Sequence, residues 1–332
     1  MVSRVSQAVL IITVQLPAAM GKLHVETPAI LSPSLTKLCG REVYLKLENL
    51  QPSGSFKLRG IGHLCEEARA AGCTEVVSSS GGNAGLAAAY AARSLQMSCT
   101  VFTPRSTPAM VVDKLRAEGA DVQIVGKNWN EANEVAVERA KRPGCCFVHP
   151  YEHPTTWTGH STLVTELQRQ LPERPAAVLL SVGGGGLANG VIEGLHRVGW
   201  DDVPVVAAET QGADCFSKAL EAGKPVSLPD ITSLAKSLGA LQVSSRLFES
   251  AQTRPVLSVV VSDRQAVEAC TRLAEEHRLL VEPACGAALA PLYYGLLPAG
   301  VSARPGPLAV VVCGGSGVTP QMLIQWQQMT AV

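Results

Sequence analysis

Short apolar runs rich in β-branched residues alternate along this chain with longer stretches in which apolar residues recur at helical spacing. This alternation predicts strands separated by helices, and therefore an α/β fold with parallel sheets. The strand runs are almost continuously apolar, as expected where helices cover both faces of a sheet. The predicted strands are 75–78, 98–102, 121–125, 177–182, 203–208 and 308–313, and the predicted helices are 83–95, 110–118, 130–141, 187–198, 263–277 and 283–297.

These elements fall into two series, at about 75–150 and 177–313. Two series predict two open sheets flanked by helices, with a cleft between them. Ligands of such sheets lie beyond the carboxyl ends of the strands, where helix N-termini point. The length of 332 residues agrees with two domains, because one domain commonly has about 100–200 residues.

Composition narrows the class of ligand. Hydrophobic residues make up 46% of the chain, enough for a sizeable interior, while charged residues make up 17% and the formal net charge is zero. A surface with no excess charge has no attraction for nucleic acid or for an anionic membrane. We therefore expect a small neutral or zwitterionic substrate, and neither a nucleic-acid partner nor a membrane.

The first twenty residues have a weak resemblance to a targeting segment. Arg4 precedes an apolar run at 8–16, which Thr13 and Gln15 interrupt and which is shorter than the roughly 20 residues that span a bilayer. The ten cysteines include no Cys-x-x-Cys pair and no zinc spacing, which favours small buried side chains in a reducing compartment. We expect a cytoplasmic protein whose N-terminus is a packed element or a misassigned gene start; a mitochondrial leader at 1–20 stays open.

The segment 48–60 carries the first candidate group. Lys57 directly follows Pro-Ser-Gly-Ser-Phe, which predicts that the lysine leaves a constrained turn. An amine held in this way can form a Schiff base if desolvation or nearby cations lower its pKa. Taken alone, a lysine is more often a solvated surface group.

The segment 78–85, Ser-Ser-Ser-Gly-Gly-Asn-Ala-Gly, follows a predicted strand and opens a predicted helix. Backbone N–H groups exposed at such a point favour an anion. Asn83 adds an amide that could bond a phenolic oxygen or a carboxylate. An ordinary strand–helix turn would also contain glycine and asparagine.

Four glycines, Gly183, Gly184, Gly185 and Gly186, again stand between a predicted strand and a predicted helix. They let backbone amides approach a phosphate closely, and the helix N-terminus adds a favourable dipole. The dinucleotide and nucleoside triphosphate fingerprints are both missing, so a lone phosphate is favoured. A mobile glycine loop without a ligand is the alternative.

Together these segments supply what an aldehyde cofactor with one phosphate needs. The motifs at 52–57, 80–85, 183–186 and 312–315 resemble those of the serine/threonine dehydratase branch of fold-type II pyridoxal-phosphate enzymes, and the resemblance covers about residues 24–320. It implies pyridoxal 5′-phosphate as cofactor and α,β-elimination of L-serine or L-threonine, giving pyruvate or 2-oxobutyrate and ammonia.

The resemblance also implies an architecture. The fold would be that of the tryptophan synthase β-like enzymes, with two open twisted sheets flanked by helices and the cofactor in the interdomain cleft. Residues 1–58 and 160–332 would form a large cofactor-binding domain, and residues 59–159 a small domain. A homodimer is expected.

Individual roles follow from the same resemblance. Lys57 matches the lysine that forms the Schiff base and takes the α proton. The other cofactor-binding matches are Phe56 on one face of the ring, Asn83 at the ring's 3′ oxygen, Gly183, Gly184, Gly185 and Gly186 at the phosphate, and Cys313 at the pyridine nitrogen. The loop that holds the substrate carboxylate matches Ser80, Gly81, Asn83 and Ala84. The ligands of a structural monovalent cation, potassium, match Glu209, Ala213 and Leu238.

Some residues have alternative interpretations. Glu209 could instead be an acid at a helix N-terminus. Gly81 and Ser237 stand where the family often has alanine, which predicts a looser pocket. We expect His149, His153 and His160 to line a turn or cleft rather than bind a metal, because no metal-binding motif surrounds them.

Three rival functions can be distinguished. A serine racemase would need an acid on the face opposite Lys57, and Ser80 is the candidate. A cofactor-binding protein of little or no activity would keep Lys57 and the glycines but release no keto acid. A nicotinamide dehydrogenase is disfavoured because the ribose-binding fingerprint is missing.

Overall fold

The computed structural model describes residues 22–331, so the possible leader at 1–20 lies outside the described residues. One sheet has six strands in the order β1-β2-β10-β7-β8-β9. All neighbouring strands in it are parallel except β1 and β2. Its strands are β1 (Ala29–Leu31), β2 (Val43–Lys46), β7 (Ala177–Ser181), β8 (Val205–Thr210), β9 (Val256–Val261) and β10 (Leu308–Val311).

A second sheet has four parallel strands in the order β5-β4-β3-β6. Val76 of β3 packs toward one hydrophobic cluster and Val77 toward another, as expected because successive side chains of a strand point to opposite faces. Both faces of this sheet are therefore covered. Its strands are β3 (Glu75–Ser78), β4 (Ser98–Thr103), β5 (Asp121–Ile124) and β6 (Cys145–Val148).

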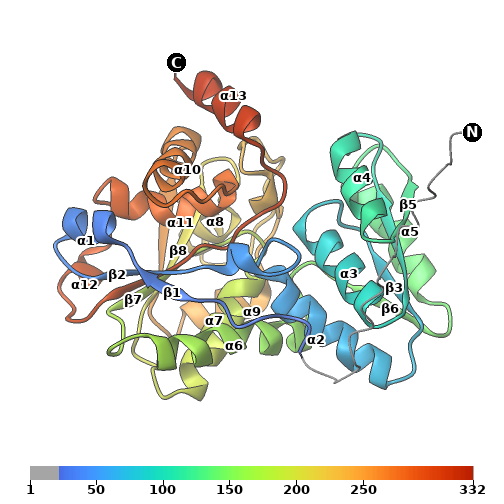
Figure 1. Ribbon diagram of the computed structural model, residues 1–332, viewed down its shortest axis with the longest axis horizontal. Helices are drawn as coiled ribbons and strands as arrows, with labels where there is room; N and C mark the ends of the chain where they lie inside the picture. Colours follow the sequence, from blue (N-terminus) through green and yellow to red (C-terminus); the bar gives the residue numbers. More distant parts are fainter. Residues whose placement is uncertain (1–21, 332) are drawn as a thin grey trace, which may run out of the picture.

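The helices cover the sheets in two lobes (Figure 1). The small lobe comprises β3–β6 with α2 (Lys57–Ala70), α3 (Asn83–Ser94), α4 (Ala109–Ala117) and α5 (Trp129–Ala140). The large lobe comprises the six-stranded sheet with α1 (Pro33–Cys39), α6 (Pro154–Gln170), α7 (Gly186–Arg197), α8 (Cys215–Ala222), α9 (Ser245–Ala251), α10 (Asp263–His277), α11 (Pro283–Tyr293), α12 (Ala299–Ser302) and α13 (Pro320–Thr330). Two 3-10 helices, η1 (Glu48–Leu50) and η2 (Lys236–Leu238), also belong to it.

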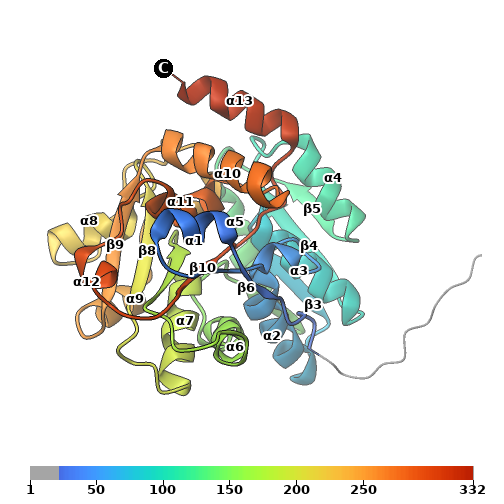
Figure 2. The same cartoon turned by 60° about the vertical axis from the view of Figure 1, so that its left-hand side comes forward.

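Helix α13 packs against α10 at the rim of the large lobe, and Figure 2 shows it as the outermost element there. Among residues 22–331, no helix is long and apolar enough to cross a membrane. All ten cysteines are free thiols.

The predicted α/β class with two helix-flanked sheets is confirmed, and each predicted strand and helix has a counterpart within a few residues. One helix end was wrong: α11 ends at Tyr293 rather than at 297, because Gly295 has a φ of +63° and leads the chain into a turn. The sequence pattern did not predict α1, α2, α6, α8, α9, α12 and α13, nor the strands β1, β2, β6 and β9. In β2, α2 and α6 the apolar spacing is weak because polar side chains are buried in them.

Those polar side chains form a buried ionic network of Lys46, Glu48, Arg59 and Glu166. The Arg59 guanidinium lies 2.7 Å from the Glu48 carboxylate and 2.6 Å from the Glu166 carboxylate. The Lys46 ammonium lies 2.5 Å from Glu166. Two positive and two negative charges cancel, and none of the four residues is more than 5% exposed. The network ties α2 to β2, η1 and α6.

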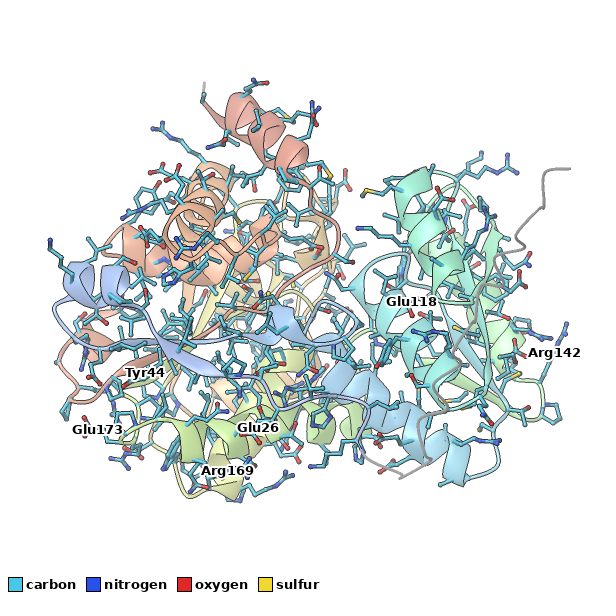
Figure 3. The ribbon with its side chains drawn as sticks, in the orientation of Figure 1. Glu26, Tyr44, Glu118, Arg142, Arg169 and Glu173 are labelled. Carbon is cyan, nitrogen blue, oxygen red and sulfur yellow. The ribbon has the colours of Figure 1, made fainter. Side chains whose placement is uncertain are left out.

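Replacing Arg59 by methionine should lower the free energy of unfolding by about 3–5 kcal/mol, because a buried charge pair that loses one partner leaves an uncompensated charge. Chemical denaturation measures this change. Arg169→Met is the matched control: its partner Glu26 lies 3.1 Å away, and both side chains are exposed on the surface (Figure 3). The control should cost less than about 1 kcal/mol. Equal losses in the two variants would contradict a stabilising role for the network.

Candidate active site

Lys57 is the first residue of α2, and the turn before it is fixed to the end of β10. The Phe56 N–H donates to the Cys313 carbonyl at 3.1 Å, and Ser55 pairs with Gly314 in an isolated antiparallel bridge. Gly54 has a φ of +81°, a conformation that L side chains rarely adopt. The predicted constrained turn is therefore present, and the tip of β10 determines where the lysine emerges.

The amine of Lys57 is partly withdrawn from solvent. It donates to the Pro150 carbonyl and lies 5.2 Å from the centroid of the Phe56 ring. Burial lowers the pKa of Lys57 to about 8, with a small opposing effect from Cys313. About a tenth of the amine is therefore uncharged at pH 7, far more than for an ordinary lysine, and the uncharged amine is the form that nucleophilic or general-base chemistry requires.

The four glycines connect β7 to α7, and the helix begins without a side-chain cap. Their neighbours approach so closely that side chains would not fit. A Cβ on Gly184 would lie 2.3 Å from the Tyr151 ring, and one on Gly183 would lie 2.9 Å from the Cα atom of Leu238. Gly185 has a φ of +93°. The first-turn N–H groups of α7 have no intrahelical acceptor and are available to an anion.

The loop 78–85 of the small lobe resembles the glycine loop 183–186, because it also joins a strand to a helix that begins without a side-chain cap. It leaves β3 and opens α3, whose N-cap Gly82 provides no side-chain cap. A Cβ on Gly85 would lie 1.8 Å from the Ser80 carbonyl oxygen, so the loop can fold over the helix start only with glycine there. The Ser80 hydroxyl accepts a hydrogen bond from the Gly82 N–H at 3.3 Å. The loop thus offers backbone donors and Asn83 at one helix end.

Gly81 and Ser237, which stand where the family often has alanine, both lie close to other residues of the structure. A Cβ on Gly81 would lie 3.1 Å from the Thr107 methyl and 3.3 Å from the Thr103 methyl, so an alanine side chain at this position would pack tightly against these threonines. The Ser237 hydroxyl donates to the Glu282 carboxylate. Neither residue simply enlarges an open pocket.

Asn83 has partners from the large lobe. Its Oδ1 accepts from the Ser316 N–H at 3.0 Å, and its Nδ2 donates to both carboxylate oxygens of Glu282 at 3.2 Å. Cys313 lies just beyond β10, only 7% exposed. Its hydrogen bond with Cys285, together with burial, raises the pKa of the Cys313 thiol well above its usual range. The thiol is therefore protonated at neutral pH.

Glu209 belongs to β8, and its carboxylate reaches the N-terminus of α8. Its two carboxylate oxygens accept from the Phe216 and Ser217 N–H groups, each at 2.8 Å. Burial nevertheless raises the pKa of Glu209 to about 8. Ala213 joins β8 through a bridge to Thr210, and Leu238 packs on Gly183. Each Glu209 oxygen keeps a free lone pair, so the residue could also bind a cation.

His149 and His153 accept hydrogen bonds within a turn, and His160 is part of the core. Ring nitrogens of His149 and His153 accept backbone N–H groups at 2.8 Å and 3.2 Å, and burial lowers the pKa of His149 to about 4. His160 is fully buried, and its ring centroid lies 5.0 Å from that of Phe56. Within residues 22–331, no group of three or more His, Cys, Asp or Glu side chains is arranged to hold a metal.

Sequence reasoning missed Tyr151 and the buried ionic network as parts of this region, and it assigned Glu282 no role. Tyr151 packs its ring on Gly184 and donates its hydroxyl to the Gln242 carbonyl at 3.3 Å. Tyr151 lies between His149 and His153 in the sequence, and no motif there indicated a contact with the glycines. The segment Glu282-Pro283-Ala284 resembles a loop near the cofactor in the family, but the sequence did not indicate which partners the Glu282 carboxylate would have.

Comparison with known proteins gives one consistent answer. The family model described as "Pyridoxal-phosphate dependent enzyme" matches residues 22–314. The human protein named "Serine dehydratase-like" is 51% identical over 315 residues, which cover 92% of this chain and 94% of that protein. The human "L-serine dehydratase/L-threonine deaminase" is 48% identical over 303 residues, covering 90% and 92%.

A solved structure agrees with these relatives. The fungal L-serine ammonia-lyase from Rhizomucor miehei superposes with a TM-score of 0.87 at 37% identity, covering 93% of this chain and 99% of that one. Such coverage means that the two lobes and the segments between them are shared over the whole fold.

The pKa of Lys57 can be tested without any ligand. Acylation of Lys57 in the purified protein, followed by peptide mass spectrometry, should reach half its maximal rate near pH 8 because burial disfavours the charged amine. Lys218, whose pKa the Glu221 carboxylate raises, is the internal control and should react only at higher pH. Parallel pH profiles for the two lysines would contradict the assignment.

Proposed function

The chain belongs to the pyridoxal-phosphate dependent enzyme family, and we propose that it is an L-serine dehydratase that also accepts L-threonine. The reaction is the loss of water and ammonia from the amino acid, giving pyruvate or 2-oxobutyrate. The observation that carries this proposal is the half-buried Lys57 amine, held beside the Phe56 ring and the Pro150 carbonyl. Its pKa, lowered to about 8, suits a base at neutral pH. The names of relatives at 51% and 48% identity support the reaction class.

The residues present fit the cofactor. The uncapped start of α7 and its four glycines would hold the phosphate, and Lys57 would bind the aldehyde. Phe56 would pack on the ring, Asn83 would donate to the ring oxygen, and Cys313 would face the ring nitrogen. When bound, pyridoxal phosphate withdraws electrons from the α carbon of the amino acid.

Residues of the chain would bind the substrate, take its α proton and contact the ring nitrogen. The loop Ser80–Ala84 would hold the substrate carboxylate with backbone N–H groups and the dipole of α3. The Lys57 Nζ would take the α proton as general base. The protonated Cys313 thiol would be a neutral partner for the ring nitrogen and would leave that nitrogen largely unprotonated. This suits an elimination, in which the departing hydroxyl relieves negative charge at the α carbon.

Potassium near Glu209, Ala213 and Leu238 is also part of the proposal. A buried carboxylate whose two oxygens each accept one N–H group keeps lone pairs for a hard cation. The raised pKa of Glu209 indicates that its negative charge is not fully compensated by those donors. A cation beside it would supply the missing charge.

The homodimer, the cytoplasmic location and the domain bounds 1–58, 160–332 and 59–159 stay predictions. The two sheets are consistent with such a division, since the four-stranded sheet uses residues 75–148. Ser80 remains the candidate acid of the racemase alternative.

Pyruvate release from L-serine is the first test. Purified protein with pyridoxal phosphate and potassium should release pyruvate, and Lys57→Ala should reduce the rate by at least about 100-fold because it removes the base. Lys218→Ala, a surface substitution, should leave the rate unchanged. D-serine formation without pyruvate would favour the racemase, and a Ser80→Ala variant would then be assayed for D-serine. An absence of both products would contradict catalysis of serine.

Glu209 should make stability depend on pH and potassium together. The folded carboxyl keeps its proton up to about pH 8, whereas the unfolded one releases it near its ordinary value. In sodium-free, potassium-free buffer, stability should therefore fall by a few kcal/mol as the pH rises from about 5 to 8. Thermal denaturation should show this fall, its reversal by potassium at pH 8, and a flat response in Glu209→Gln. Identical pH and potassium responses in both proteins would disprove the cation site.

A further inference from the structure

Glu282 is a buried carboxylate that the proposed function leaves without a role. It occupies the N-cap position of α11 but does not cap that helix with its side chain. The residue is 6% exposed. The loop after β10 is built around it: a Cβ on Gly315 would lie 2.2 Å from its Cδ, and one on Gly317 would lie 2.9 Å from its Oε1.

Its hydrogen-bond partners among residues 22–331 are neutral donors. The Gly317 N–H donates to Oε1 at 2.7 Å, and the Ser237 hydroxyl donates to Oε2. The Asn83 amide Nδ2 donates to both oxygens at 3.2 Å. A carboxylate in such surroundings makes charge-assisted hydrogen bonds, which are stronger than those between neutral groups.

These contacts fix which way the Asn83 amide points. Its Oδ1 faces two donors, the Ser316 N–H at 3.0 Å and the Ser316 hydroxyl at 3.2 Å. Its Nδ2 faces the Glu282 carboxylate, which can only accept. The reverse orientation would put the amide oxygen against the carboxylate and two N–H groups against donors.

The same contacts join the two lobes at the candidate site. Asn83 begins α3 of the small lobe, whereas Glu282, Ser237 and Ser316 belong to the large lobe. Lys114 of α4 adds a hydrogen bond to the Ser316 carbonyl. The Pro52–Gly54 turn, Lys114 and Ser316 line one groove between the lobes.

We propose that Glu282 is a positioning residue that fixes the Asn83 amide as a donor and thereby couples the small lobe to the loop after Cys313. The use of that donor toward the cofactor rests on the proposed function, but the coupling between the lobes does not. The nearest alternative is a glutamate that merely fills space at the start of α11.

Hydrogen exchange of the cofactor-free protein measures the coupling directly. Amides 83–86 and 313–317 should exchange about 10-fold faster or more in Glu282→Ala, because a hydrogen bond to a charged group typically contributes about 1.5–3 kcal/mol. Glu276→Ala is the matched control, since Glu276 on α10 accepts from Ser34 at 2.6 Å and Tyr293 at 2.9 Å. It should leave both segments unchanged. Unchanged exchange in Glu282→Ala would overturn the proposal.

A pair of near-isosteric substitutions separates positioning from space filling. Asn83→Asp sets two carboxylates against each other, and Glu282→Gln replaces one of the two oxygens that the Asn83 Nδ2 contacts by an amide nitrogen, so each alone should speed exchange of both segments. The double variant reverses the donor and acceptor: the introduced glutamine amide donates to the introduced aspartate. It should recover most of the wild-type protection. Additive loss in the double variant would overturn the proposal.

The link to the site is tested by titrating the proteins with pyridoxal phosphate and following its absorbance. Glu282→Gln should weaken binding about 10-fold, while Glu276→Ala should not. Normal binding in Glu282→Gln would overturn the positioning role. If the wild-type protein bound no pyridoxal phosphate, the proposed function would fail, whereas the hydrogen-exchange result would still decide the coupling between the lobes.

Discussion

The buried network of Lys46, Glu48, Arg59 and Glu166 is the constraint on which the geometry of the site depends. Arg59 lies two residues after Lys57, in the first turn of α2, and both Glu48 and Glu166 hold its guanidinium. Removing four charges from water is costly, and their mutual neutralisation offsets that cost only in a well-defined arrangement. The start of α2 is therefore fixed against the large lobe, although the rest of the helix packs on the small lobe.

A fixed helix start determines where the reactive groups lie. The turn before Lys57 is bonded to the end of β10, so the lysine and Cys313 are held by the same backbone contact. The loops before α3 and α7 carry glycines at close backbone approaches, and both helices start without side-chain caps. Helix ends with free backbone N–H groups from the two lobes are thus combined with a lysine fixed between the lobes.

The electrostatics of the site follow from its burial. Desolvation lowers the pKa of Lys57 and of His149, while a thiol partner and burial raise that of Cys313, so these groups tend toward their neutral forms. The Glu282 carboxylate accepts hydrogen bonds from the neutral Ser237 hydroxyl and Gly317 N–H groups. A nearly neutral site costs less to bury than a charged one, and it leaves the lysine amine able to accept a proton.

The sequence by itself determined the fold class, the two series of strands and the segments proposed to carry the site. Continuous apolar runs indicate strands that are buried on both faces of a sheet. The glycines at 183–186 and Gly85 indicate positions where neighbouring atoms lie too close for a side chain. Tertiary structure alone decided which polar residues became partners. Arg59 looks like an ordinary helix residue until Glu48 and Glu166 surround it, and Glu282 meets Asn83 across 199 positions of sequence. Such pairings depend on how the two lobes pack, and a local pattern of apolar and polar residues carries no record of that packing.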